Sequence, residues 1–244
     1  MKKIITIIFT SLLAIACSTD DTANVSTVTN YPLLELNGAA TVFVPQGGTY
    51  SDLGCVSTEG GKVIPNVSTF TGKYRGAKTL DTNTPDEYIQ TYTATNKDGF
   101  FATASRKVVV YKTGDLVNSI EGVYLCTISR NGATPSANYR NIKYIYIWKN
   151  ANGTFQISDA FGGWYEYGRG LGIGYITPGG TITGNIATNT FTYPGNPLTN
   201  SGFGGVANIK DLTVNAATKE VVLTTTWTAP TAYTFIAKLT QVQL

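Results

Sequence analysis

The sequence predicts an all-β protein made of two antiparallel domains. Three observations support this fold class. Short runs rich in Thr, Val, Ile and Tyr alternate in polarity, as expected of half-buried strands. Turn residues follow these runs at short intervals, among 26 Gly in 244 residues. Residues that favour helices are scarce after position 16.

Residues 1–17 are predicted to be a lipoprotein signal peptide. Lys2 and Lys3 precede the apolar stretch 4–16, which is too short to span a bilayer. The sequence Ala14-Ile15-Ala16-Cys17 resembles a bacterial lipobox, which implies cleavage before Cys17 and acylation of that residue. The alternative is a plain signal peptide with an unrelated cysteine.

Residues 18–30 lack a hydrophobic period and are interpreted as a tether. The acidic pair Asp20-Asp21 resembles the surface-export signal of Bacteroidetes lipoproteins. The resemblance implies a lipid-anchored protein of the outer membrane that faces the cell exterior.

Residues 31–113 are predicted to form a small antiparallel sandwich. A turn is expected at Asn37-Gly38, and a hairpin connection is expected at Asn96-Lys97-Asp98-Gly99. In the last strand, Arg106 is expected to share a face with Val108 and Val110. The order of four segments resembles the bacterial Ig-like module related to hyalin-type repeats: Leu33 to Gly38, Gly48 to Cys55, Tyr88 to Asn96 and Arg106 to Val110. The resemblance implies an Ig-like spacer without catalytic residues.

Residues 114–244 contain all three Trp residues and are predicted to form an aromatic-rich antiparallel meander, closed as a barrel or folded as a sandwich. The expected strands are 122–129, 142–148, 154–158, 164–167, 181–186, 190–193, 206–214, 221–227 and 233–239. The segment Phe161 to Gly170 and the final two strands resemble the C-terminal domain of unknown function that follows such Ig-like modules in Bacteroides lipoproteins. Some of those proteins belong to glycan-uptake gene clusters.

The segment from Phe161 to Tyr175 is the candidate binding site. Aromatic rings separated by glycines leave flat faces on which sugars can stack, while carboxylates and Arg bind hydroxyl groups. Predicted ligand-binding residues are Trp164, Tyr165, Glu166, Tyr167, Arg169, Trp148 and Asp159. A strand would place Trp164 and Glu166 on one face and Tyr165 and Tyr167 on the other. The alternative is that these rings pack in the core.

A second aromatic row, Tyr144, Tyr146 and Trp148, shares one face of its predicted strand. Ile145 and Ile147 occupy the opposite face. If the isoleucines face the core, the aromatic row is either covered by another element or exposed for binding.

The composition excludes several kinds of chemistry. The chain has no His, which removes Ser-His-Asp and Cys-His catalysis. The net charge is +3, or +1 without residues 1–17, and no basic stripe indicates a nucleic-acid partner. No cofactor or metal is expected. Cys55 and Cys126 are expected to be buried free thiols in different domains rather than a disulfide.

The expected function is therefore non-catalytic: a lipid-anchored surface protein that binds a glycan or another extracellular polymer. Its expected partners are the membrane, through Cys17, and a polysaccharide or surface protein. A structural or adhesive protein is the alternative. A less favoured alternative is a glycoside-acting enzyme with Asp159 and Glu166 as its two carboxylates.

Overall fold

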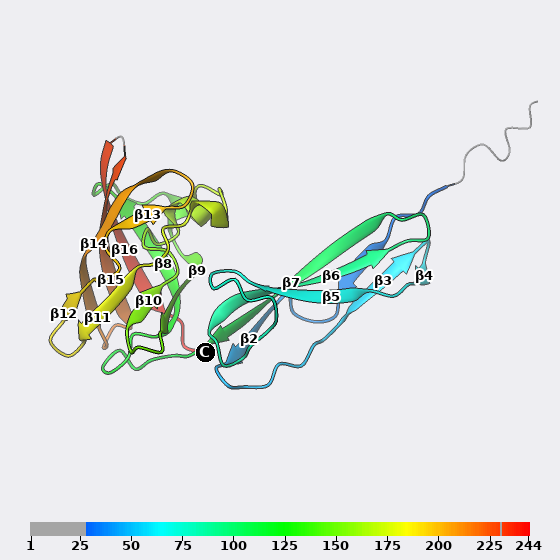
Figure 1. The fold of residues 1–244 in the computed structure, drawn as a ribbon, viewed down its shortest axis with the longest axis horizontal. Coiled ribbons are helices and arrows are strands. Elements are labelled where there is room, and N and C mark those ends of the chain that lie inside the picture. The colour runs from blue at the N-terminus through cyan, green and yellow to red at the C-terminus, as the bar shows by residue number, and fades with distance from the viewer. Residues whose placement is uncertain (1–27, 230) are drawn as a thin grey trace, which may run out of the picture.

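The computed structural model describes residues 28–229 and 231–244 and consists almost entirely of strands. Cys17, Asp20, Asp21, the signal peptide and most of the tether lie outside the described residues. Two β domains lie end to end (Figure 1). In the part of the chain that the structure describes, no helix is long and apolar enough to cross a membrane.

The first domain consists of two facing sheets with the strand orders β1-β3-β4 and β2-β7-β6-β5. Its strands are β1 (Leu33–Leu36), β2 (Thr41–Pro45), β3 (Cys55–Glu59), β4 (Lys62–Val63), β5 (Val67–Gly72), β6 (Asp86–Thr95) and β7 (Phe101–Tyr111). The predicted antiparallel sandwich is wrong at one pair of strands, because β2 pairs with β7 in parallel. Strands β1 and β2 belong to different sheets, so a short crossover lets β2 run beside the last strand of the domain.

Arg106 lies on the buried face of β7, as the alternation predicts, together with Val108 and Val110. Its guanidinium group is fully buried and donates to the carbonyl oxygens of Asn37 and Ala39, at 2.5 and 3.0 Å. These hydrogen bonds offset the free-energy cost of burying a charged guanidinium group inside the sandwich. They also hold the loop between β1 and β2 against the sheet.

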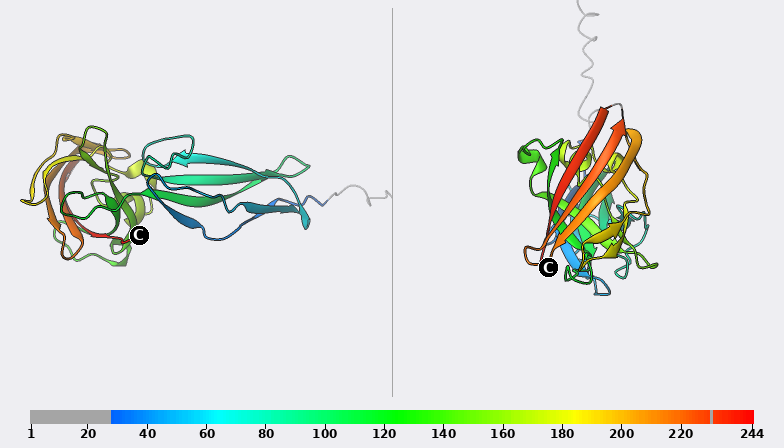
Figure 2. Two further views of the ribbon diagram at one scale, coloured as in Figure 1. Left: turned by 90° about the horizontal axis from the view of Figure 1, so that it is seen from below. Right: turned by 90° about the vertical axis from the view of Figure 1, so that its left-hand side faces the viewer.

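The second domain is one continuous antiparallel sheet with the order β12-β11-β10-β9-β8-β16-β15-β14-β13. Its strands are β8 (Gly122–Arg130), β9 (Ile142–Lys149), β10 (Phe155–Ile157), β11 (Thr181–Asn185), β12 (Thr190–Thr192), β13 (Leu198–Asn200), β14 (Gly204–Asn215), β15 (Glu220–Ala229) and β16 (Thr231–Gln241). The sheet is curled rather than split into two facing layers (Figure 2). Strand β13 was not expected from the sequence, and the predicted strand 164–167 is wrong.

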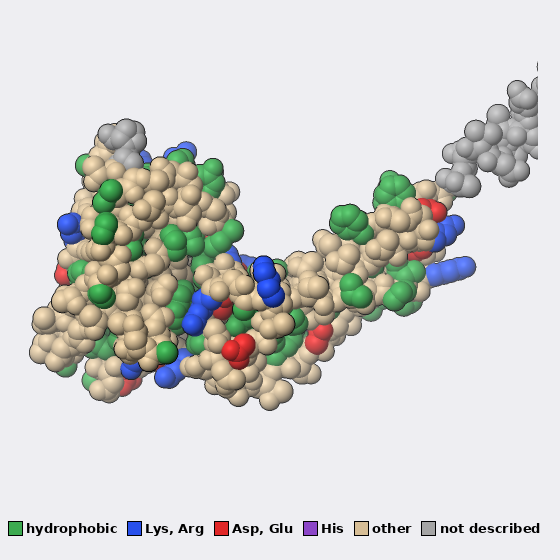
Figure 3. Space-filling model, in the orientation of Figure 1, with side chains coloured by type: hydrophobic (Ala, Val, Ile, Leu, Met, Phe, Trp, Pro, Cys, Tyr) green, Lys and Arg blue, Asp and Glu red, His purple; other side chains and the backbone are tan. Residues whose placement is uncertain are grey.

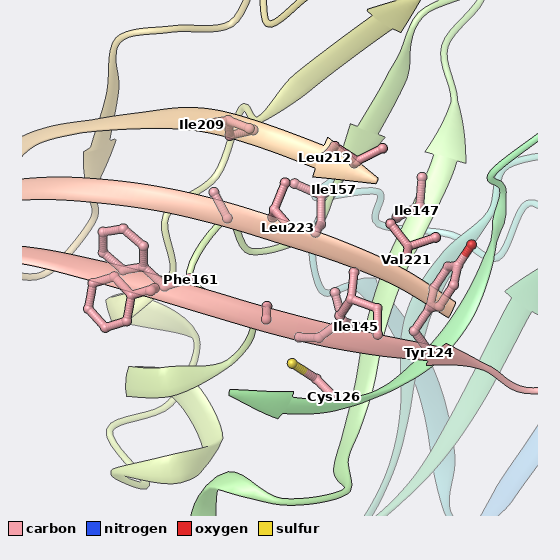
Figure 4. Packing of buried hydrophobic residues seen from close by; sticks show 14 of the residues in the cluster. Tyr124, Cys126, Ile145, Ile147, Ile157, Phe161, Ile209, Leu212, Val221 and Leu223 are labelled. Atoms are coloured by element: carbon pink, nitrogen blue, oxygen red, sulfur yellow. The ribbon is translucent and has the colours of Figure 1, made fainter. Parts of the chain in front are cut away.

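The concave side of this sheet holds the core of the second domain. Side chains from β8, β9, β14, β15 and β16 point into it (Figure 4). Phe161 comes from the segment between β10 and β11 and lies among these strands. The core therefore includes a segment of chain that enters the concave side of the sheet.

Three short helices accompany the sheet: η2 (Ala137–Tyr139), η3 (Trp164–Gly168) and η4 (Ile173–Tyr175). Helix η3 is a π-helix, with amide groups of Gly168 and Arg169 donating to the carbonyls of Gly163 and Trp164, five residues earlier. Gly162 and Gly163 precede it with positive φ angles of 59° and 82°. This backbone permits the sharp turn into the helix, which explains why a strand does not form here.

Candidate functional site around helix η3

Asp159 holds the beginning of the segment that contains η3. Its carboxylate accepts hydrogen bonds from the amides of Phe161, Gly163 and Thr177, at 2.9 to 3.0 Å. The residue is fully buried, and burial raises its pKa to about 7, while the backbone donors oppose this rise. Asp159 thus binds its own chain rather than facing solvent.

Trp164 lies at the edge of the core with only 8% of its surface exposed. Tyr139 of η2 stacks on its ring at a centroid distance of 3.8 Å and an angle of 10°. The guanidinium of Arg130 lies over the same Trp ring and over Tyr233, at 4.9 and 4.5 Å. The indole N–H is buried without a hydrogen-bond partner.

Tyr165 continues the aromatic packing toward the surface. It contacts Phe161 and Trp227 on its inner side and Phe203 on its outer side, with centroids 5.0 Å apart for the last pair. Phe203 packs on Tyr175 at 4.9 Å and is 49% exposed. A continuous series of rings therefore leads from the core to solvent.

Glu166 and Tyr167 lie at the boundary between the domains, not at this exposed end. Lys73 follows β5 in the first domain, and its ammonium lies 2.8 Å from Glu166 and 3.1 Å from Glu87. It also donates to the hydroxyl of Tyr167, at 2.7 Å. Nearby carboxylates and Tyr167 raise the pKa of Lys73 against the opposing effect of burial.

Two tyrosines complete what we call the interdomain cluster, which consists of Lys73, Tyr74, Glu87, Tyr146, Glu166 and Tyr167. The hydroxyl of Tyr74 donates to Glu166 at 3.2 Å, and that of Tyr146 donates to Glu87 at 2.6 Å. Burial and the neighbouring carboxylates raise the pKa of both phenols well above the ordinary value. The cluster is a buried set of charges shared by both domains.

The aromatic row of β9 is covered by the first domain. Tyr146 and Trp148 form a buried cluster with Val109 of β7. Tyr144 contacts Phe43 at 5.8 Å, and Arg75 lies 5.4 Å from the Trp148 ring. Of the two possibilities left open by the sequence, the structure therefore shows coverage of this row. The isoleucines of β9 face the core of the second domain, so the condition set by the sequence is met.

The structure thus separates the seven predicted binding residues into three environments. Asp159, Trp164 and Tyr165 lie within the second domain, whereas Trp148, Glu166 and Tyr167 lie at the domain boundary. Arg169 is exposed. Their binding role stays a prediction, but the strand geometry on which it rested is wrong. Sequence reasoning missed Phe203 and Arg130, because only the fold brings them next to helix η3.

The two carboxylates of the predicted glycosidase pair are both bound by other groups of the protein. The Asp159 carboxylate is bound to three amides and the Glu166 carboxylate to Lys73 and Tyr74, so both acids have internal partners. Cys55 and Cys126 are free, as predicted, but the predicted burial is wrong for Cys55. Cys126 is buried, whereas Cys55 is only partly buried. Within the described ranges, no cluster of three or more potential protein ligands for a metal is present.

The two facing sheets of the first domain and the single curled sheet of the second define a two-domain all-β protein, and the comparisons with known proteins agree with this class. Residues 34–110 match the family model described as bacterial surface protein, Ig-like domain. The first domain is therefore an Ig-like domain of the kind found in bacterial surface proteins.

Residues 113–241, more than half of the chain, match the C-terminal domain model of a second family. The chain belongs to this BT2262-like family. The predicted resemblance of the first half to a bacterial Ig-like module and of the second half to a C-terminal domain of Bacteroides lipoproteins is thus confirmed.

One solved structure shows the same fold over most of the chain. The crystal structure of the lipoprotein BT2262 from Bacteroides thetaiotaomicron is 24% identical in sequence, with a TM-score of 0.61. The match covers 86% of this chain and 100% of that chain. No curated protein matches.

Proposed function

We propose that this surface protein is anchored through lipidated Cys17 at the outer face of the outer membrane and binds a glycan or similar extracellular polymer without catalysis. The exposed end of the aromatic series, at Phe203 and Tyr175, is the binding surface. The Ig-like domain serves as a spacer between the membrane and this surface.

The observation that carries the binding proposal is the exposure of Phe203 on a rigid aromatic support. Its ring rests on Tyr165 and Tyr175, and Tyr165 is itself packed against the core. A ring held in this way can stack on the C–H face of a sugar with little loss of conformational entropy. Leu171 and Ile173 are exposed on the neighbouring glycine-rich segment, and so is Arg169, whose guanidinium can donate to hydroxyls.

Binding is favoured over glycoside hydrolysis because of the state of the two acids. A glycosidase needs two carboxyl groups that reach the scissile bond from opposite sides. Asp159 and Glu166 are instead buried and engaged with backbone amides and with Lys73. This observation supports a non-catalytic role.

The binding proposal is tested with the mature chain by affinity electrophoresis in gels that contain a panel of polysaccharides. Phe203→Ala should weaken retention by roughly 5- to 150-fold, as expected for a central aromatic contact worth about 1–3 kcal/mol. Phe101→Ala is the matched control, because Phe101 is an exposed phenylalanine of the other domain. Equal retention of both variants, or retention of the native chain by no polysaccharide, favours the structural or adhesive alternative. Release of reducing ends by the native chain, lost in Glu166→Gln, favours the enzyme.

The anchoring proposal is tested in cells. Cys17→Ala should release the protein or mislocalise it, because acyl chains contribute about 0.8 kcal/mol for each buried methylene. Persistence of the Cys17→Ala product in salt-washed membranes contradicts this anchor. Surface display is tested separately with the double change Asp20→Ala and Asp21→Ala, which should reduce cleavage by external protease.

A further inference from the structure

The far end of the Ig-like domain carries a group of exposed apolar side chains that no element of the described chain covers. We call this group the tip collar: Tyr31, Leu33, Val63, Val67, Phe100 and Phe101. Val63, Leu33 and Phe101 are 78%, 71% and 70% exposed. Such side chains normally occur singly on a soluble surface, so their concentration at one end requires an explanation.

Strand register shows that the collar surrounds the tip. Leu33 pairs with Thr58, which pairs with Val63, so Leu33 and Val63 lie on the same outer face of the three-stranded sheet. Phe101 pairs with Thr95 on the outer face of the opposite sheet.

One further register pair and one aromatic contact complete the collar. Val67 pairs with Thr93, the next outward residue of the same strand after Thr95. At the end itself, the rings of Tyr31 and Phe100 lie 5.0 Å apart. Apolar groups are therefore present on both faces of the sandwich and across its end.

The tip is also the place where the chain enters the domain. The described chain begins at this end, opposite to the second domain (Figure 1). The carbonyl of Asn30 accepts a hydrogen bond of 2.8 Å from the side chain of Asn96, which fastens the entering chain to the β6–β7 turn. Only ten residues separate Cys17 from Val28, and a chain of that length spans at most about 36 Å. A lipid on Cys17 would keep the tip close to the bilayer.

We propose that the tip collar inserts into the headgroup region of the membrane and acts as a second contact beside the lipid anchor. This inference rests on the proposed lipidation of Cys17. The collar has exposed apolar side chains on both faces of the sandwich. Lipid can surround the tip and contact both faces at once, whereas a second copy of the chain would cover only one face.

The charges at the tip indicate apolar rather than electrostatic docking. Lys62 and Lys97 are exposed there, but Glu59 and Asp98 lie beside them. Figure 3 shows apolar, basic and acidic side chains together at this end. Since the opposite charges balance, membrane contact of the tip should persist at high salt.

The test measures the depth of the tip in vesicles. The lipidated full chain is reconstituted into vesicles of phosphatidylethanolamine and phosphatidylglycerol that contain brominated lipid. A fluorophore is attached to Lys97→Cys on a Cys55→Ser background, because Cys126 is buried and Lys97 is exposed outside the collar. Ala187→Cys, in the exposed turn at the opposite end of the molecule, is the matched label.

Brominated lipid should quench the label at position 97 by at least two-fold, with or without high salt, and leave the label at position 187 unchanged. The double variant Leu33→Ser and Phe101→Ser should abolish this quenching while the lipid on Cys17 remains detectable by mass spectrometry. The matched control Val206→Ser, an exposed apolar residue of the second domain, should retain it.

The proposal is overturned if the anchored protein shows no quenching at position 97, or if the collar variant is quenched equally. It is also overturned if ultracentrifugation shows a dimer that the collar variant loses, because the occupant is then a second copy. If mass spectrometry finds no lipid on Cys17, the anchoring proposal fails by itself. Flotation of the mature chain with the same vesicles, with and without the collar substitutions, then decides the collar separately.

Discussion

Asp159 shows how one buried carboxylate organises a segment of chain. Its three backbone donors come from both sides of helix η3, so the carboxylate joins the beginning of this segment to Thr177. An interior amide without an acceptor costs about 1–3 kcal/mol. This arrangement explains why an acid occupies the interior of a domain with an otherwise apolar core.

The raised pKa of Asp159 predicts a dependence of stability on pH. The folded-state pKa, about 7, lies above the ordinary value of 3.8, so folding favours the protonated form. The contribution of Asp159 is then largest below about pH 4 and is lost as the pH rises toward 7. Thermal unfolding across this range should show a decline that is smaller in Asp159→Asn.

The sequence contains no His, so no imidazole titration contributes to the pH dependence of stability in this interval. Asp86 is the relevant comparison, because burial also raises its pKa. If Asp159→Asn and the native chain have parallel pH profiles, Asp159 does not titrate in this range.

Trp164 is expected to contribute to folding rather than to direct binding. Its ring lies between Tyr139 and Phe235, at centroid distances of 3.8 and 5.7 Å. Trp164→Ala should therefore lower the free energy of unfolding by about 3–5 kcal/mol, as measured by denaturant titration. Phe203→Ala should lower it much less, because half of that side chain is already exposed. A stable Trp164→Ala protein that has lost polysaccharide retention would support the original binding prediction.

Helix η3 depends on glycines at positions where the core leaves no room. A Cβ on Gly162 would lie 2.7 Å from the Cβ of Ala237 and 3.0 Å from the Sγ of Cys126. At Gly170, which has a similar positive φ, no atom lies within 4 Å of the added Cβ. The two positions therefore differ in the room available for a side chain, but both require a positive φ angle.

This difference predicts unequal effects of the same substitution. Gly170→Ala should cost about 1 kcal/mol, for the strained backbone alone. Gly162→Ala should cost about 2–4 kcal/mol, because overpacking against β8 and β16 is added. Equilibrium unfolding measures both, and equal losses would mean that the chain moves away from β16 at little cost.

Strands in which apolar and polar residues alternate clearly were predicted well, whereas strand β13 and helix η3 were not. The long strands β15 and β16 carry alternating apolar residues and lie close to their expected ranges, 221–227 and 233–239. Strand β13 has only three residues and was missed, although the equally short β10 and β12 fall within the predicted strands 154–158 and 190–193. Helix η3 was predicted as a strand because its aromatic side chains resemble a strand pattern, whereas glycine backbone angles and the Asp159 hydrogen bonds determine its conformation.

On the scale of the molecule, the interdomain cluster joins two domains that each have a core of their own. Lys73 is the single cation within hydrogen-bonding distance of both Glu87 and Glu166 among the described ion pairs. Buried charges of this kind are costly when one partner is removed, since the remaining carboxylates stay desolvated.

Lys73→Met should therefore destabilise the native protein by about 3–5 kcal/mol and separate the unfolding of the two domains. Differential scanning calorimetry should show one transition in the native chain and two in the variant. Lys78→Met, at an exposed site of the same domain, should leave a single transition. Two transitions already present in the native chain would show that the cluster does not couple the domains, in line with an Ig-like domain that folds alone.

The sequence by itself determined the all-β class, the resemblance of the first part to a bacterial Ig-like module and that of the second part to a C-terminal domain of Bacteroides lipoproteins. These follow from local information: alternation along strands, turn residues and short segments of characteristic order. Only the tertiary structure decided where the residues of the candidate site lie and what they contact. Trp148 is covered by the first domain, Glu166 is paired with Lys73 from 93 positions earlier, and Phe203 emerges beside Tyr165. Burial and pairing of this kind arise from contacts between distant segments, so no local pattern encodes them.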